Sequence, residues 1–422
     1  MKEPPEPMPE KVAGVVDVIK ISEIVTRKRK MKRIYISALG LFSFYQIQAQ
    51  QIKTDSASVG KLKVDEVNLV SSYYKQDGNN SAVTGGIGTE KLTDISNIIN
   101  VKLIRYDKKK RKHTFGAELG IDHYTSASSD MIDLKANSSA SSQDIRVYPS
   151  LSWQVENEEK GNSFMAGVSS STEYDYQSFG ANIGFSKKTA NKMGELTTNL
   201  HAYIDQVKLI LPIELRQGTA EDGGTDSRNT FAASLSYSQI INANLQLVFL
   251  VDAVQQNGLL SLPFHRVYFS DGSVHQEKLP DNRFKLPLGF RANYFLGDRF
   301  IIRTYYRYYT DNWGINSHTF NIETPVKLSP FVSLSPFYRY YTQTAVKYFG
   351  AYQTHNESNG FYTSNYDLSG FNSQFFGMGA RFNLPNGLLG ISKFNMIEIR
   401  YGHYTKTTGM KGDIISLNLK FK

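Results

Sequence analysis

The chain of 422 residues contains no cysteine. This absence excludes disulfide bonds, thiolate metal ligands, haem attached through a Cys-x-x-Cys-His motif, and a cysteine nucleophile. Long apolar runs are also missing, since hydrophobic residues make up 40% of the chain and the mean hydropathy is −0.37. No stretch after residue 50 is long and apolar enough to predict a transmembrane helix.

The positive charge does not form a concentrated patch. The net charge is +9, but residues 1–49 alone hold nine Lys/Arg against five Asp/Glu, which leaves 39 against 34 for the rest of the chain. The basic run 107–113, "DKKKRKH", is interpreted as a solvated turn or one that meets lipid headgroups. We therefore expect no nucleic-acid partner.

The N-terminus carries an export signal. Residues 31–49 have a short basic start, an apolar run and a small residue, Ala49, before Gln50, which is typical of a signal peptide cleaved at that point. Residues 1–30 do not fit such a signal and are interpreted as a spurious or cytoplasmic extension. An uncleaved signal anchor is the alternative. Residues 50–63 are expected to form a short periplasmic segment.

Segments of alternating polarity follow, separated by turn-rich stretches. They predict sixteen strands: 64–75, 95–106, 112–124, 143–156, 163–173, 176–188, 195–209, 228–240, 244–255, 285–296, 299–310, 315–328, 331–344, 374–384, 393–405 and 413–422. In the last one, Ile415, Leu417, Leu419 and Phe421 share one face, as a barrel-closing strand requires.

The connections between these segments differ in length in a regular way. The long ones occur only at odd positions, and every even-numbered one is short. This layout predicts an all-β fold: a single transmembrane antiparallel up-and-down β-barrel over residues 64–422, with about 16 strands (14–18), long extracellular loops and short periplasmic turns. A secreted β-sandwich or propeller is the alternative, but it would need shorter strands.

Tyrosine is unusually abundant, with 26 residues, and Tyr-Arg-Tyr-Tyr-Thr occurs at 306–310 and again at 338–342. Alternation predicts one face of each strand toward a polar lumen and the other toward lipid headgroups, where tyrosine collects. The predicted lumen-lining residues are Arg303, Tyr305, Arg307, Tyr309, Glu323, Arg339 and Tyr341. The predicted aromatic girdle consists of Tyr306, Tyr308, Tyr338 and Tyr340.

Three blocks, 71–90, 311–319 and 338–349, resemble a family of bacterial outer-membrane proteins catalogued as the domain of unknown function 3570. The resemblance covers the chain from about residue 64 to its end and is to members of Bacteroidetes type. It implies a barrel in the outer membrane of a Gram-negative envelope, exported through a cleaved signal peptide. It also implies gene neighbours that include a small lipoprotein, a thioredoxin-like protein and a flavin transferase. The expected partners are outer-membrane lipid, the barrel-assembly machinery and such a lipoprotein or thioredoxin-like protein.

No motif indicates catalysis, a cofactor or a metal. The eight histidines include no His-x-x-x-His pair, and Asp122-His123 is the only candidate for an outer-membrane hydrolase dyad. The glycine-rich stretch "TGGIGTE" lacks the ending of a phosphate-binding loop. We interpret its residues Thr84, Gly85, Gly86, Gly88 and Glu90 as a tight turn, or as a constriction or partner-binding loop.

The sequence thus predicts a non-enzymatic pore or transport channel for small hydrophilic solutes. The alternative is a non-conducting barrel scaffold for a periplasmic or surface partner in redox chemistry or secretion. An outer-membrane hydrolase is a third and weaker hypothesis.

Overall fold

The computed structural model describes residues 60–125, 143–216 and 222–422, except 357, 359 and 389. The predicted extension (1–30), the signal peptide (31–49), its cleavage point between Ala49 and Gln50, and residues 50–59 lie outside the described residues. None of the helices in the described ranges is long and apolar enough to cross a membrane.

Antiparallel strands account for most of the described chain. Their bounds are β1 (Lys63–Asp77), β2 (Leu92–Tyr106), β3 (Lys112–Thr125), β4 (Gln143–Asn157), β5 (Asn162–Thr172), β6 (Tyr176–Lys188), β7 (Gly194–Ile210), β8 (Asp222–Asn242), β9 (Leu245–Gly258), β10 (Arg266–Tyr268), β11 (Val274–Gln276), β12 (Asn282–Leu296), β13 (Phe300–Asp311), β14 (Asn316–Glu323), β15 (Val326–Lys327), β16 (Val332–Gln343), β17 (Phe371–Asn383), β18 (Phe394–Lys406) and β19 (Lys411–Phe421). Three short 3-10 helices lie in the connections: η1 (Ala82–Thr84), η2 (Ile213–Leu215) and η3 (Tyr366–Leu368).

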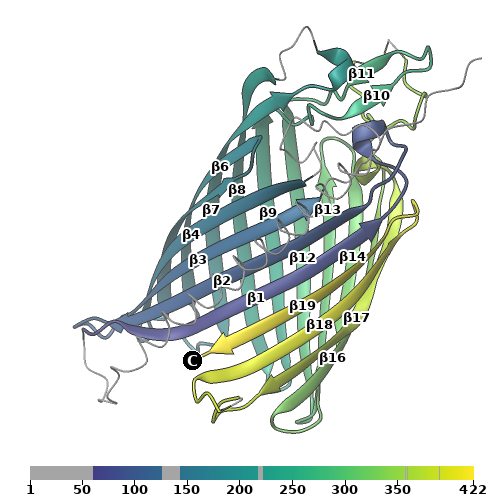
Figure 1. Cartoon of the computed structure of the whole chain (residues 1–422). Helices are drawn as coiled ribbons and strands as arrows, with labels where there is room; N and C mark the ends of the chain where they lie inside the picture. Colours follow the sequence, from purple (N-terminus) through teal and green to yellow (C-terminus); the bar gives the residue numbers. More distant parts are fainter. Residues whose placement is uncertain (1–59, 126–142, 217–221, 357, 359, 389) are drawn as a thin grey trace, which may run out of the picture. The chain divides into compact units, whose positions relative to one another are not determined.

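The sheet closes on itself. Ser71 of β1 is opposite Asn97 of β2 on one side and Leu417 of β19 on the other. β14 and β15 occupy one position in the wall because both pair with β13 and β16, and β10 and β11 form a separate hairpin. The described residues therefore form a closed barrel of sixteen strands, as predicted, with strongly tilted strands (Figure 1).

Two strands depart from the sequence prediction. The segment 315–328 was expected to be one strand, but it is divided between β14 and β15 at Thr324-Pro325. Proline has no N–H to donate to the ladder, which explains the interruption. β8 begins at Asp222 rather than at 228, so the loop before it is shorter than predicted.

Large apolar side chains cover one face of the wall. Examples whose side chains are exposed at the barrel surface are Phe179, Ile183, Leu200, Ile204, Phe231, Phe249, Met378 and Ile399. A surface of this kind is unfavourable in water and is the exterior that a bilayer covers. The neighbouring residues along each strand point to the other face and are mostly polar.

The connections between strands differ at the two ends of the barrel. At one end lie all the long ones: 78–91, 126–142, 211–221, 259–281 and 344–370. The same end also has three short connections, 173–175, 312–315 and 407–410. The C-terminus lies at the opposite end (Figure 1), where the connections have at most five residues except for 384–393, which has ten.

Parts of four long connections pack together, and we call residues 78–91, 211–216, 259–281 and 344–370 the loop assembly. Arg266 of β10 has no exposed surface; it forms an ion pair with Glu214, and its Nη1 donates to the Val83 carbonyl over 2.9 Å. A separate apolar cluster joins Leu279 and Val346 of the loop assembly to Trp313 and Ile315. These connections are therefore folded against one another.

Candidate functional site

One contact identifies the inner face of the wall. Arg400 of β18 lies 3.4 Å (Nη1 to Oε1) from Glu323 of β14, although β16 and β17 stand between the two strands. Side chains from strands that far apart approach one another only on the concave side of a sheet. Residues that share a face with Arg400 and Glu323 therefore point into the barrel.

The seven residues predicted to line the lumen lie on this face. Arg303 and Glu323 are directly opposite in the β13–β14 register, with Nη1 and Oε1 3.7 Å apart. The Tyr309 hydroxyl donates to Asp311 Oδ2 over 2.7 Å, and the Tyr341 hydroxyl donates to Gln343 Oε1 over 2.5 Å. The same alternation gives this orientation to Tyr305, Arg307 and Arg339.

The four tyrosines predicted to form the girdle lie on the opposite face. Tyr306, Phe320 and Tyr340 form a row across β13, β14 and β16. Tyr308 donates to Asn316 Oδ1 over 2.9 Å and lies 5.3 Å from the His318 ring, centroid to centroid. Tyr338 is opposite Ile322 in the same ladder. Their level in a membrane stays a prediction.

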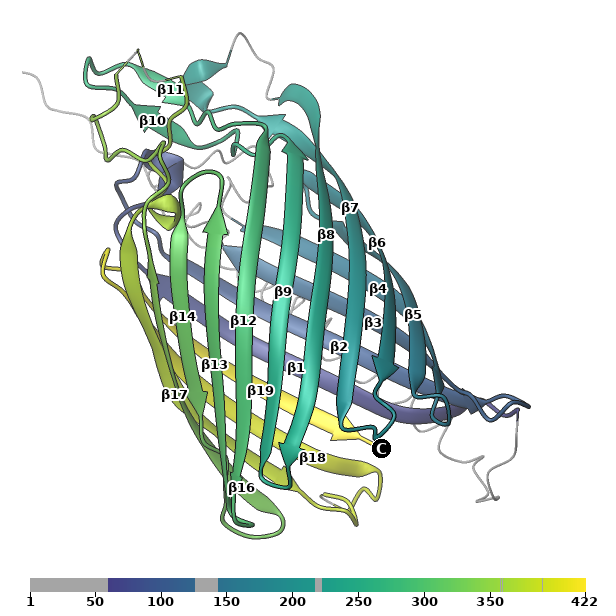
Figure 2. The ribbon, with the colours of Figure 1, turned by 180° about the vertical axis from the view of Figure 1, so that it is seen from behind.

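Three inward arginines have aromatic rather than acidic neighbours. The guanidinium carbons of Arg291, Arg307 and Arg339 lie 5.2 Å from the Tyr305 ring, 6.0 Å from the Tyr309 ring and 5.7 Å from the Phe375 ring. Within the described ranges none of the three forms an ion pair with a carboxylate. Their positive charges are therefore uncompensated on the arc formed by β12, β13 and β16 (Figure 2).

The opposite arc carries negative charge. Asp94, Glu118 and Asp122 face inward from β2 and β3, eight strands away from β12 and β13 in the sheet order. Asp122 accepts hydrogen bonds from Ser96 Oγ at 2.5 Å and Tyr148 Oη at 2.9 Å, and Glu118 accepts one from Asn100 Nδ2 at 3.1 Å. In the described part of the chain, none of the three carboxylates has a Lys or Arg at ion-pair distance. The two arcs therefore set up a transverse electric field.

A cavity of about 400 Å³ opens on the inner wall, with lining residues from β3 to β8. Arg146 Nε donates to Ser171 Oγ over 2.9 Å. Arg228 donates from Nε to Asp205 Oδ2 over 3.0 Å and from Nη2 to the Tyr176 hydroxyl over 2.8 Å. The remaining lining is rich in hydroxyl groups: Tyr148, Ser150, Ser169, Ser170, Ser178, Tyr203 and Thr230. Such a lining offers hydrogen-bond donors and acceptors to the lumen.

The sequence analysis did not single out Arg146 or Arg228. The alternation of the strand predicted at 143–156 already put Arg146 on the same face as Tyr148, but nothing in the sequence brought six strands, β3 to β8, to one pocket. A second cavity, of about 530 Å³, shares Arg146, Tyr176 and Arg228 with the first and reaches loop residues such as Phe264. The two cavities therefore meet at these three residues, between the loop assembly and the lumen wall.

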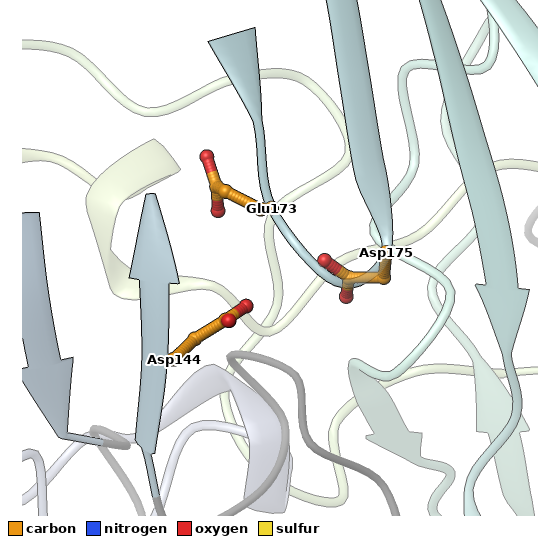
Figure 3. Close-up of side chains that lie close together, drawn as sticks. All are labelled: Asp144, Glu173 and Asp175. Atoms are coloured by element: carbon orange, nitrogen blue, oxygen red, sulfur yellow. The ribbon is translucent and has the colours of Figure 1, made fainter. Parts of the chain in front are cut away.

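Three carboxylates meet beside this second cavity (Figure 3). Asp144 comes from the start of β4, and Glu173 and Asp175 from the connection between β5 and β6. One carboxylate oxygen of each residue lies within 4.8 Å of those of the other two. Burial, and then the charges of Asp144 and Glu173, raise the pKa of Asp175 to about 6.

The glycine-rich stretch packs inside the loop assembly. Gly85, Gly86 and Gly88 have φ of 80°, 86° and 82°, in the left-handed region that favours glycine. A Cβ on Gly85 would lie 2.5 Å from Cδ2 of Tyr268, and Thr84 is buried at the end of η1. Burial raises the pKa of Glu90 at the end of the stretch. The tight-turn interpretation accounts for this geometry, and a role in constriction or partner binding stays a prediction.

Asp122 and His123 do not form a dyad. They are adjacent in β3, so their side chains point to opposite faces of the wall, and Asp122 is engaged with Ser96 and Tyr148.

Solved structures with a similar arrangement are outer-membrane proteins. OccD3 (OpdP) of Pseudomonas aeruginosa has 8% identity and a TM-score of 0.43, with 87% of this chain and 92% of that chain covered. OccK9 (OpdG) of the same species has 10% identity and a TM-score of 0.41, covering 87% and 99%. The siderophore receptor PirA of Acinetobacter baumannii has 10% identity and a TM-score of 0.43, covering 83% and 54%.

At the level of sequence, no curated protein matches the chain. A family model described as "Protein of unknown function (DUF3570)" matches residues 31–419. The chain therefore belongs to the DUF3570 family, as the three sequence blocks predicted.

Proposed function

We propose that the protein is an outer-membrane channel for small hydrophilic solutes and that it prefers anions. The observation that carries the proposal is the row of inward arginines, Arg291, Arg307 and Arg339, held against aromatic rings without carboxylate partners in the described residues. A free guanidinium in a water-filled lumen attracts and orients anionic groups. A channel for oils would instead need an apolar lumen.

The outer membrane is the compartment that fits the fold. A closed barrel leaves no strand edge without a partner, and its apolar exterior suits a bilayer rather than water. The hydroxyl-rich cavity at Arg146 and Arg228 provides a place where a polar solute can pause along the wall.

The test is single-channel recording in a planar bilayer, using the chain purified from membranes in detergent. We expect discrete ohmic steps and, under a salt gradient, a reversal potential of anion-selective sign. Arg307→Glu and Arg339→Glu should each shift the reversal potential toward cations. Arg307→Lys, which keeps the charge, is the matched control and should retain the selectivity.

An open channel whose selectivity is the same in wild type, Arg307→Glu and Arg339→Glu would contradict the role given to these arginines. A silent bilayer, with the barrel shown to be folded by its heat-modifiable migration in gels, would contradict the channel itself. The scaffold hypothesis would then predict a lipoprotein or thioredoxin-like partner that copurifies in stoichiometric amount.

A further inference from the structure

The three carboxylates near the loop end of β4 have a fixed geometry. Glu173 and Asp175 flank Tyr174 in a three-residue connection that is closed by a hydrogen bond from the Glu173 N–H to the Tyr176 carbonyl, 2.8 Å long. In Figure 3 the carboxyl groups of Glu173 and Asp175 lie on the side of the turn that faces Asp144. The backbone of a tight hairpin, rather than a mobile surface, therefore positions two of the three groups.

Asp144 provides an independent indication of a ligand. Its side chain is aimed at the other two carboxylates, and the residue is only 3% exposed. Oδ1 accepts a hydrogen bond from the Ile145 N–H at 2.7 Å and the Tyr174 N–H also favours the ionised carboxylate, whereas Oδ2 is buried and has no hydrogen-bond partner within 3.5 Å. A buried carboxylate oxygen without a partner is costly, and a bound cation is one way in which proteins remove that cost.

The surrounding positive charge is too small to neutralise the cluster. Arg146 Nε lies 3.5 Å from Glu173 Oε1, and the Tyr124 hydroxyl donates to Glu173 Oε2 over 2.5 Å. Lys208 donates its backbone N–H to the Asp175 carbonyl over 2.8 Å, its Nζ lies 3.4 Å from the Tyr174 hydroxyl, and its positive charge also acts on the Asp175 carboxylate. Arg146 and Lys208 together offset two of the three carboxylates, so one negative charge remains for a ligand.

We propose that Asp144, Glu173 and Asp175 form a binding site for a divalent cation of the calcium type. The three protein ligands are all carboxylate oxygens. Hard cations prefer such oxygen ligands, whereas softer metals favour histidine or cysteine. Ca²⁺ also tolerates irregular coordination that water completes, whereas Mg²⁺ demands a near-ideal octahedron. Glu173 and Asp175 line the cavity of about 530 Å³, which gives an ion a route to the site.

The ion would join parts of the wall that the sheet leaves apart. The β4–β5 ladder ends at the pair Val147 and Thr172, so the first residues of β4 extend beyond their β5 neighbour. A cation shared by Asp144 and the β5–β6 turn would tie this end of β4, which pairs with β3 alone, to the adjacent hairpin.

Terbium(III) luminescence tests the site directly, because Tb³⁺ takes the same oxygen ligands as Ca²⁺ and is sensitised by nearby tyrosine. The Tyr124 hydroxyl is already hydrogen-bonded to Glu173. With the full chain in detergent, freed of metal by a chelator, we expect a saturable signal that Ca²⁺ displaces and equimolar Mg²⁺ does not. Asp144→Asn and Asp175→Asn should each weaken the affinity by about tenfold or more.

Asp281→Asn is the matched control, because Asp281 is an exposed carboxylate of the loop assembly outside the cluster. This variant should bind Tb³⁺ as the wild type does. If Asp144→Asn does not fold, Asp175→Asn, in the turn between strands, provides a second measurement of the Tb³⁺ affinity. Calorimetry of the wild type with Ca²⁺ alone provides an independent measurement of cation binding. The proposal is overturned by the absence of saturable binding, by equal affinity in the wild type and the cluster variants, or by displacement with Mg²⁺ as effective as with Ca²⁺.

Discussion

Arg266 shows how one side chain can hold several connections together. Its guanidinium has no exposed surface, lies 5.0 Å from the centre of the Phe264 ring, and satisfies the Glu214 carboxylate and the Val83 carbonyl at once. Only a planar group with several donors can serve both acceptors in this geometry. Three connections therefore depend on a single cation.

Replacing this cation should loosen the loop assembly without unfolding the barrel. In Arg266→Met the Glu214 carboxylate loses its partner, and we expect the free energy of local opening to fall by about 3 kcal/mol. Limited proteolysis of intact protein should show faster cleavage between residues 211 and 281, while heat-modifiable migration is unchanged. Lys278→Met, which removes a cation with no ion pair in the described part of the same connection, should behave as wild type. Equal cleavage of both variants would argue against this role for Arg266.

The same pair predicts sensitivity to acid. Burial raises the pKa of Glu214, but the hydrogen bonds from Arg266 outweigh it and leave that pKa below its ordinary value. Because the folded-state pKa is lowered, the stabilisation is present above the ordinary glutamate pKa of about 4.3 and is lost as the pH falls through the lower folded-state value. Pepsin digestion across this window should show a pH-dependent loss of loop protection in the wild type. Glu214→Gln should lack that dependence, and a wild-type profile in this variant would refute the assignment.

At the scale of the strand, β19 makes both faces of the wall testable. Leu417 lies in mid-strand on the apolar exterior, and Asn418 points inward opposite Glu398. Leu417→Lys should lower the free energy of unfolding by about 2–4 kcal/mol, since a charge at the bilayer midplane is costly. Asn418→Lys should have a much smaller effect because it enters a polar interior beside an acid. Urea unfolding in lipid vesicles measures both, and equal losses would mean that the faces are assigned wrongly.

The wall strands were predictable because lipid on one side and a polar interior on the other make the polarity of the side chains alternate with every residue. The β10–β11 hairpin was not predicted, since each of its strands has three residues and packs within the loop assembly, where no such alternation is required. The break at Pro325 agrees with its missing N–H, yet alternation on both sides masked it. Proline alone would not have identified the break, because Pro149, Pro287 and Pro336 lie within the continuous strands β4, β12 and β16.

Contacts between non-adjacent strands could not be predicted at all. Arg400 meets Glu323, and Arg146 and Arg228 line one cavity, because tilt and register bring distant sequence positions to one level. Alternation determines which face a residue occupies but not its height in the barrel. The cluster of Asp144, Glu173 and Asp175 was not predicted for the same reason, although Glu173 and Asp175 lie at a turn that the sequence did predict.

For the whole molecule, the separation of charge between the two arcs should govern ion selectivity, so that removing charge from one arc or the other shifts the preference toward anions or toward cations. Asp122→Asn combined with Glu118→Gln removes negative charge from the β3 side and should raise the anion preference, opposite to the effect of Arg307→Glu. Screening should diminish both shifts at about 1 M salt, where the Debye length is only about 3 Å. Reversal potentials at low and high salt measure this, and shifts that persist unchanged at high salt would exclude a field effect.

The pairing of β1 with β19 also has a consequence for the order in which the barrel assembles. These strands lie at the two extremes of the described chain, yet each is the other's neighbour, from Val67 opposite Phe421 to Asp77 opposite Lys411. If the polypeptide is delivered from its N-terminus, β1 must keep one ladder edge open until β19 has arrived. A chain that stops before β19 would therefore carry two unmatched edges, and its fate would depend on whatever holds those edges apart during biogenesis.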